Sequence, residues 1–233
     1  MSDKKKKLLV FSGAGVSAES GLKTFRDQGG LWEDYDISEV ATPQAWQANR
    51  DLVLKFYNMR RKQLFKATPN TAHKAIAELE NYFDVEVITQ NIDDLHERAG
   101  STKVTHLHGE LRKVQSERYP DLIYDFEKEE IEIGDLCEKG HQLRPHVVWF
   151  GEAVPMMEKA YEIACNAELF VVVGTSLNVY PAAGIINFVP NNTKCWLIDP
   201  NSSEYQLPKK WKLIQDKAGA AMPNLLEELK KLA

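Results

Sequence analysis

The sequence lacks the features that would place the protein in a membrane or in an oxidising compartment. No apolar run reaches the roughly 20 residues that a membrane span needs, and the N-terminal segment has no apolar signal-peptide core. Cysteine is scarce and its positions are far apart: Cys137, Cys165 and Cys195. The last two lie in apolar segments, where we expect them to be small buried hydrophobic residues. These absences together predict a soluble, cytoplasmic protein.

The chain also lacks a strong charge of one sign. Its formal net charge is −5, with acidic and basic residues mixed throughout, and the lysines at 4–7 are typical of a solvated tail. We therefore expect no nucleic-acid partner and no membrane partner. With 233 residues, of which 43% are hydrophobic, the chain can bury one large core or a large and a small one.

A glycine-rich turn near the N-terminus organises the rest of the sequence. The apolar run at residues 8–11 predicts a buried parallel strand, and GAGVSA at residues 13–18 follows it directly. A strand that runs into such a turn lets the main chain approach the pyrophosphate of a dinucleotide. The alternative is a tight turn that binds no ligand.

The residues after this turn disfavour an ordinary nicotinamide dehydrogenase. Gly21, Gly29 and Gly30 would break the long helix that such an enzyme needs here. The segment between them contains Phe25 and Arg26 and is typical of a loop that closes over a bound dinucleotide.

Apolar strands alternate with amphipathic helices along the chain, which predicts an α/β fold. We expect a Rossmann-like, mostly parallel sheet with helices on both faces, formed by residues 1–32, 82–110 and 146–233. A small second domain would comprise residues 33–81 and 111–145. Expected strands are residues 8–11, 85–88, 104–107, 169–173 and 195–198, with residues 147–150 returning to the main core. Expected helices are one near Pro43 and residues 51–64, 71–82, 94–99, 156–167, 181–189 and 223–232.

Short polar clusters follow several of these strands. The clusters are TQNID at residues 89–93, HGE at 108–110, GTS at 174–176 and Asp199. In an open parallel sheet the carboxyl ends of the strands share one edge, and ligands bind there. The sequence thus predicts a dinucleotide site at this edge.

Five segments together resemble the sirtuin family of NAD-dependent protein lysine deacylases: GAGVSAESG with TFRDQGGLW, TQNIDDLHERAG, HLHGE, RPHVVWFGE and VVVGTS. The resemblance extends from about Leu8 to the end of the chain. It implies that NAD is consumed as a co-substrate and that acyl-lysine proteins or peptides are the partners. The expected products are nicotinamide, free lysine and O-acyl-ADP-ribose.

The resemblance also implies roles for particular residues. His108 would be the catalytic base, with Asn91 and Asp93 orienting ribose and nicotinamide. The acyl-lysine peptide would lie against Val148, Trp149, Phe150 and Gly151, partly by strand addition. NAD would be bound by Gly13, Ala14, Gly15, Ser17, Phe25, Arg26, Gln90, Asn91, Ile92, Asp93, Gly174, Thr175, Ser176, Asp199, Asn201 and Ala218.

An imidazole with a near-neutral pKa suits the base role, because it can take a proton from a ribose hydroxyl. Other interpretations remain open for its neighbours. Asp93 can simply cap the following helix, and we expect His96 and His106 to be structural.

A finer resemblance concerns the acyl group. Tyr57 and Arg60 lie one turn apart on a predicted helix, so arginine can bind a carboxylate while tyrosine adds a hydrogen bond. With the small Ala41, this YxxR pattern is similar to the sirtuin branch that removes succinyl and malonyl groups. We expect the neighbouring Arg61 and Lys62 to be ordinary solvated charges.

Residues 111–143 depart from the family, in which two cysteine pairs bind a structural zinc ion. Here only Cys137 and His141 are candidate ligands, and a closed site needs four. We therefore expect no zinc. Two alternative functions also remain: transfer of ADP-ribose onto a protein, and a non-catalytic module that binds NAD or a peptide.

Overall fold

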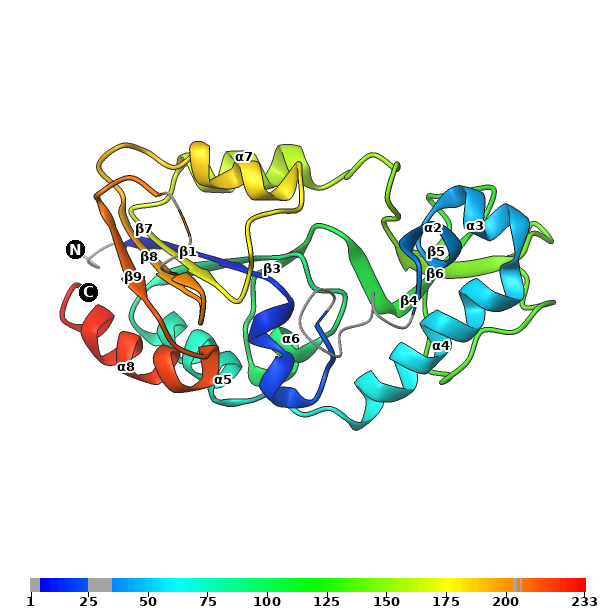
Figure 1. Cartoon of the computed structure of the whole chain (residues 1–233), viewed down its shortest axis with the longest axis horizontal. Coiled ribbons are helices and arrows are strands. Elements are labelled where there is room, and N and C mark those ends of the chain that lie inside the picture. Colours follow the sequence, from blue (N-terminus) through cyan, green and yellow to red (C-terminus); the bar gives the residue numbers. More distant parts are fainter. Residues whose placement is uncertain (1–4, 25–34, 203–204, 206) are drawn as a thin grey trace.

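The computed structural model describes residues 5–24, 35–202, 205 and 207–233. Its main feature is a six-stranded sheet with the order β3-β2-β1-β7-β8-β9, in which every neighbouring pair is parallel. The strands are β1 (Lys7–Ser12), β2 (Asp84–Thr89), β3 (Val104–His106), β7 (Leu169–Val173), β8 (Lys194–Ile198) and β9 (Trp211–Ile214). This sheet forms the larger part of the molecule in Figure 1. The predicted Rossmann-like, mostly parallel sheet is confirmed.

Both faces of this sheet are buried. Because successive side chains of a strand point to opposite sides, each strand contributes to two separate cores. Leu8 and Val10 of β1 belong to one core, which α5 (Thr71–Glu78) and α8 (Ala218–Lys230) cover. Leu9 and Phe11 belong to the opposite core, beneath α7 (Met157–Cys165) and the 3-10 helix η4 (Ala182–Asn187). Figure 1 shows α7 on one side of the sheet and α5 with α8 on the other.

A second, smaller unit lies beyond the sheet (Figure 1). It contains a three-stranded antiparallel sheet of order β5-β4-β6 and has its own hydrophobic core. The strands are β4 (Gly109–Ser116), β5 (Ile123–Asp125) and β6 (Leu143–Val147), and the helices are α2 (Ile37–Val40), α3 (Pro43–Ala48) and α4 (Arg50–Lys66). The remaining elements are η1 (Ala14–Val16), η2 (Ala18–Ser20), η3 (Leu79–Asn81) and α6 (Leu95–Ala99).

Local sequence signals account for the starts of α3, α4 and α5. Pro43 occupies the first turn of α3, and Thr42 accepts a hydrogen bond from the amide of Ala45. Asn49 caps α4, and Asn70 forms a capping box with His73 at the start of α5. These caps fix where the polypeptide enters each helix.

Several expectations about the fold were wrong in detail. The buried side chains of α5 belong to the core of the large sheet, whereas we expected residues 71–81 in the small domain. Val147 and Trp149 belong instead to the small core, because β6 pairs with β4 and not with the main sheet. Cys165 is exposed at the end of α7, in contrast to the buried Cys195. No helix in the described ranges is long and apolar enough to cross a membrane.

Candidate active site

A cleft runs along the carboxyl edge of the parallel sheet and reaches the small unit. Its walls are formed by the segments that follow β1, β2, β3, β7 and β8, as the pattern of polar clusters predicts. Most of the expected NAD-site and catalytic residues line it: Gly13, Ala14, Gly15, Ser17, Gln90, Asn91, Ile92, Asp93, His108, Gly174, Thr175, Ser176, Asp199 and Asn201.

Close contact between glycines brings the ends of β1 and β7 together. The amide of Gly15 donates to the carbonyl of Gly174, with an N to O distance of 2.8 Å. A Cβ atom on Gly15 would lie 2.8 Å from Cα of Gly174, and one on Gly174 would lie 2.2 Å from the amide nitrogen of Val16. Gly174 also has φ +63. A side chain at either position would therefore force this wall of the cleft apart.

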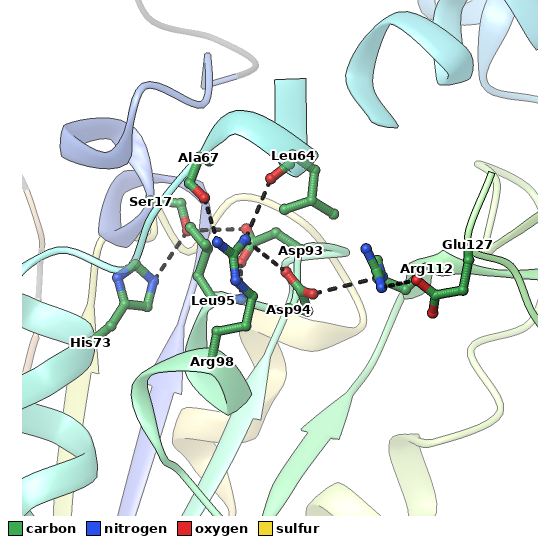
Figure 2. A network of polar contacts seen from close by, with 10 residues as sticks. All are labelled: Ser17, Leu64, Ala67, His73, Asp93, Asp94, Leu95, Arg98, Arg112 and Glu127. Atoms are coloured by element: carbon green, nitrogen blue, oxygen red, sulfur yellow. Dashed lines mark hydrogen bonds and ion pairs between the residues drawn. The ribbon is translucent and has the colours of Figure 1, made fainter. Parts of the chain in front are cut away.

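A buried polar network joins the segment after β1 to the segment after β2 (Figure 2). The Ser17 hydroxyl donates to Oδ2 of Asp93 over 3.0 Å and accepts from the Asn91 amide over 3.1 Å. His73 Nε2 lies 3.4 Å from the Ser17 hydroxyl oxygen. Ser17 thus fixes the relative position of Asn91 and Asp93.

The N-cap of α6 is Asp94 and not Asp93 as we considered, but the Asp93 side chain bonds to the first residue of this helix. Its Oδ1 accepts from the amide of Leu95 at the start of α6, over 3.2 Å. Burial raises the pKa of Asp93, although the bonds from Leu95 and Ser17 act in the opposite direction. A bond to the start of α6 and a place on the cleft are therefore compatible.

His108 lies where a base can act. Its Nδ1 is 3.0 Å from the carbonyl oxygen of Gln90, which can only accept a hydrogen bond. Nδ1 therefore carries the proton, and Nε2 is the basic nitrogen. Burial lowers the pKa of His108 below its ordinary value, which keeps the ring neutral near pH 7. Gln90 in turn donates from Nε2 to the Thr175 hydroxyl over 2.8 Å, linking the ends of β2 and β7.

Helix α4 ends against this same region (Figure 2). The Arg98 guanidinium donates to the carbonyls of Leu64 and Ala67 at the C-terminal end of α4, over 3.4 and 2.6 Å. Arg98 also pairs with Asp94, and Asp94 with Arg112. These contacts tie α4 to the segment that carries Asp93.

The expected acyl-recognition residues also line the cleft: Ala41, Tyr57 and Arg60. The guanidinium carbon of Arg60 lies 5.9 Å from the ring centroid of Tyr57. Burial raises the pKa of Tyr57 to about 12, so its hydroxyl stays protonated and can donate. Burial also lowers the pKa of Arg60, although Tyr57 and Asp93 oppose this shift. The cleft thus contains a desolvated cation beside a hydrogen-bond donor.

Residues 148–151 form the neighbouring wall, and internal bonds hold them in place. The amides of Val148 and Phe150 donate to the carbonyls of His108 and Ala41, over 2.9 and 3.0 Å. The Trp149 amide donates to Oε2 of Glu152 over 2.7 Å. Val148, Trp149, Phe150 and Gly151 all line the cleft.

Arg144 supports this wall; it opens the segment RPHVVWFGE, but we expected no role for it from the sequence. Arg144 forms a bidentate pair with Glu152, with N to O distances of 2.9 and 3.1 Å. Its guanidinium carbon lies 3.6 Å from the ring centroid of Trp149. Because Arg144 comes from β6, a strand that the sequence analysis did not predict, no periodic pattern could have indicated it.

Some expected site residues lie elsewhere. Ala218 is buried in the large core as the first residue of α8 and is not among the residues that line the cleft. Phe25 and Arg26 fall outside the described residues. Arg61 is fully buried with its guanidinium carbon 5.0 Å from the Phe126 ring centroid, so the expectation of a solvated charge was wrong. Lys62 is partly exposed and pairs with Glu130.

The degenerate zinc segment offers no ligand set. Cys137 donates from Sγ to the Ser116 hydroxyl, and the His141 ring packs against Tyr119 with centroids 5.4 Å apart. Within the described ranges, no three His, Cys, Asp or Glu side chains are grouped as a metal site would require. These residues do not fit the four-ligand zinc site of the family, and the absence of zinc stays a prediction.

The residues at the sheet edge do fit a dinucleotide. Glycines line the cleft at Gly13, Gly15 and Gly174. Because they have no side chain, the phosphates of a dinucleotide can approach the main chain closely there. Hydroxyl, amide and carboxylate groups that can bind ribose surround it, among them Thr175 and Asp199. The sheet and this cleft define a Rossmann-like, dinucleotide-binding α/β protein.

Comparison with known proteins identifies the family. The Sir2 family model matches residues 13–181, and the chain therefore belongs to the Sir2 family. A protein of Helicobacter pylori (strain ATCC 700392 / 26695) named NAD-dependent protein deacylase is 50% identical over 228 residues, covering 98% of this chain and 99% of that protein. A Sir2 homolog–NAD complex has a TM-score of 0.86 at 40% identity and covers 98% of this chain and 91% of that one. A Sir2 complex with deacetylated p53 peptide and 3′-O-acetyl ADP-ribose has a TM-score of 0.79 at 27% identity, with 98% and 95% covered.

Proposed function

We propose that the protein is an NAD-dependent protein deacylase that removes acyl groups from lysine side chains. The products are nicotinamide, free lysine and O-acyl-ADP-ribose. One observation carries this proposal: His108, Asn91 and Asp93 line the same cleft as the glycines after β1 and β7 and the peptide-side residues 148–151. The similarity to NAD-dependent protein deacylases over nearly the whole chain supports it.

Each of these side chains has a task that its surroundings allow. When bound, NAD supplies an electrophilic ribose carbon that the acyl oxygen attacks as nicotinamide leaves. Ser17 holds Asn91 and Asp93 in fixed positions, so their polar groups can orient ribose and nicotinamide without reorganising. His108 is neutral and has a basic Nε2, so it can take a proton from a ribose hydroxyl.

The peptide would add to the edge formed by residues 148–151. The amides of Val148, Trp149 and Phe150 already donate within the protein. A substrate strand would therefore donate its own amides to carbonyls of this segment, and the amide of Gly151 would donate back.

We further propose a preference for acidic acyl chains such as succinyl and malonyl. An acyl chain that ends in a carboxylate would meet the Arg60 guanidinium and the Tyr57 hydroxyl, both on the wall of the cleft. Ala41, whose side chain is small and buried, leaves room beside them. Two hydrogen bonds from arginine and one from tyrosine suit a carboxylate.

Incubating the protein with acetyl-, succinyl- and malonyl-lysine peptides, with and without NAD, tests both proposals. We expect mass spectrometry to find free lysine, nicotinamide and an acyl-ADP-ribose only when NAD is present. Free lysine without NAD would contradict the first proposal. Attachment of ADP-ribose to the peptide would instead favour a protein ADP-ribosyltransferase. If no nicotinamide is released with any of the peptides, the protein would be a non-catalytic binding module.

A further inference from the structure

Residues 106–111 bind the main chain of the catalytic segment at every position from Thr89 to Ile92. The amides of Leu107 and Leu111 donate to the carbonyls of Thr89 and Ile92, over 2.9 and 2.7 Å. The imidazoles supply the two bonds between them. His108 Nδ1 lies 3.0 Å from the Gln90 carbonyl, and His106 Nδ1 lies 2.8 Å from the Asn91 carbonyl.

The two imidazoles differ in their second nitrogen. His106 Nε2 lies 2.7 Å from Oε1 of Glu97 on α6, and its side chain is only 6% exposed. Because a carbonyl and a carboxylate both accept hydrogen bonds, both nitrogens of His106 must donate for the two bonds to coexist. With Glu97 ionised, this geometry calls for an imidazolium at His106, whereas His108 needs one proton only.

The surroundings of His106 favour this charge. Burial alone would lower the pKa of His106, yet the bonds to Glu97 and Asn91 and the nearby Glu110 raise it. The same bond lowers the pKa of Glu97. The charged and titratable groups around His106 are Asp93 after β2, His96 and Glu97 on α6, Glu110 and Lys113 on β4, and His146 on β6.

We propose that His106 is a positioning residue: a buried imidazolium that links Glu97 to the Asn91 carbonyl and holds the catalytic segment in place. This inference rests on the proposed function. The role goes beyond the purely structural one that the sequence led us to expect for His106. Losing the proton removes one of the two bonds, and a displaced Asn91 weakens the orientation of the reacting groups.

The proposal predicts an alkaline limb in the pH profile of kcat. His106 keeps its proton below its raised pKa and loses it as the pH rises, so kcat falls on the alkaline side. In Glu97→Gln the carboxylate no longer stabilises the cation, and this limb should move to lower pH by about one unit, a tenfold change in proton affinity. The KM for the peptide should stay the same, because the ring bonds of His106 go to Asn91 and Glu97 and not to residues 148–151.

A direct measurement of charge does not depend on activity. With ¹⁵N-labelled histidine, NMR should show both nitrogens of His106 protonated at pH 7 in the wild-type protein and at a lower fraction in Glu97→Gln. His141→Gln, in the small unit just before β6, serves as the matched control and should change neither readout. His106→Gln should lower kcat by at least about tenfold and abolish the limb.

The outcomes separate the two proposals. A neutral His106 at pH 7, or profiles of Glu97→Gln that superimpose on the wild type after uniform scaling, would overturn the positioning role. If the wild type shows no deacylation, the proposed function fails, while the NMR signal still decides the state of His106. Should His106→Gln not fold, Glu97→Gln decides, because its side chain is 41% exposed and tolerates the change.

Discussion

The Arg60 guanidinium carbon lies 5.9 Å from the Tyr57 ring centroid, one helical turn away on α4, and both residues line the cleft that contains His108. Because α4 is a regular helix from Arg50 to Lys66, this relationship follows from the spacing of i and i+3 side chains. A cation and a neutral hydroxyl thus line the same part of the cleft.

We expect Arg60→Met to discriminate between acyl groups. Removing one partner of a desolvated, charge-assisted pair costs roughly 2–5 kcal/mol, whereas an acetyl group does not reach that partner. Catalytic efficiency on succinyl-lysine peptides should therefore fall by at least about tenfold, at 1.4 kcal/mol per decade. Efficiency on acetyl-lysine peptides should change little. Steady-state kinetics on both peptides measure the difference.

Lys62→Met is the matched control for this experiment. Its side chain is 43% exposed and faces Glu130, so neither substrate should be affected. Arg61 is unsuitable, because it is fully buried and its replacement would disturb the small core. Equal losses on both substrates in Arg60→Met would mean that Arg60 supports the fold or the NAD site, and the acyl preference would then be wrong.

His108 should determine the acid limb of the pH–rate profile. We expect His108→Ala to lower kcat by about two to four orders of magnitude, the usual contribution of a general base, while NAD still binds. Because burial lowers the pKa of His108, the wild-type rate should decline only below about pH 6.5. Calorimetry of NAD binding and a pH–rate profile check both statements. Undiminished turnover in His108→Ala would remove the imidazole from the mechanism.

Buried His73 should make the fold sensitive to acid. Burial lowers its pKa from 6.5 to about 4. Between these values the unfolded chain binds a proton that the folded chain does not, so stability is lost as the pH falls. The total loss is on the order of 3 kcal/mol, at 1.36 kcal/mol per pKa unit. Urea unfolding at pH 7, 6 and 5 should show a decline that His73→Asn makes shallower and His141→Asn does not. An unchanged slope in His73→Asn would contradict this assignment.

The small domain should fold without metal. The Cys137 thiol donates to the Ser116 hydroxyl over 3.4 Å. Among the described residues, no group of metal ligands surrounds this pair. Elemental analysis of the purified protein should find no bound zinc, and a chelator should leave both activity and the thermal midpoint unchanged. One zinc per chain, with activity lost to the chelator, would show that ligands come from a source we have not assigned.

The sequence predicted best where local pattern and tertiary structure coincide. Residues 169–173 are apolar on both faces, which only a central strand with helices on both sides requires, and they form β7. In contrast, β9 is an edge strand in which Trp211 is buried and Lys212 and Leu213 are exposed, and the sequence showed no clear apolar run there. The start of α8 was missed because Pro223 suggested the first turn, although the helix begins at Ala218.

The site shows the same limit. The order of polar clusters predicted which residues share the cleft, because strand ends of one parallel sheet must meet. The YxxR pattern separated Arg60 from Arg61, but it did not show that Arg61 is fully buried, because the packing around a helix decides which of its other faces are covered. Likewise, Arg144 pairs with Glu152, eight residues further along the chain. Neither residue belongs to a repeating apolar pattern, so no helix or strand period predicts the pair.

Helix α4 carries Tyr57 and Arg60 on a single continuous element, capped by Asn49 and closed by Arg98, while the cofactor-facing residues lie on the strand ends of the large sheet. If Arg60 and Tyr57 select the acyl group as we propose, two of the three selecting residues lie within one helix of 17 residues, apart from the strand ends. Substitutions in this helix would then change the accepted acyl group while the strand ends that face the cofactor keep their sequence.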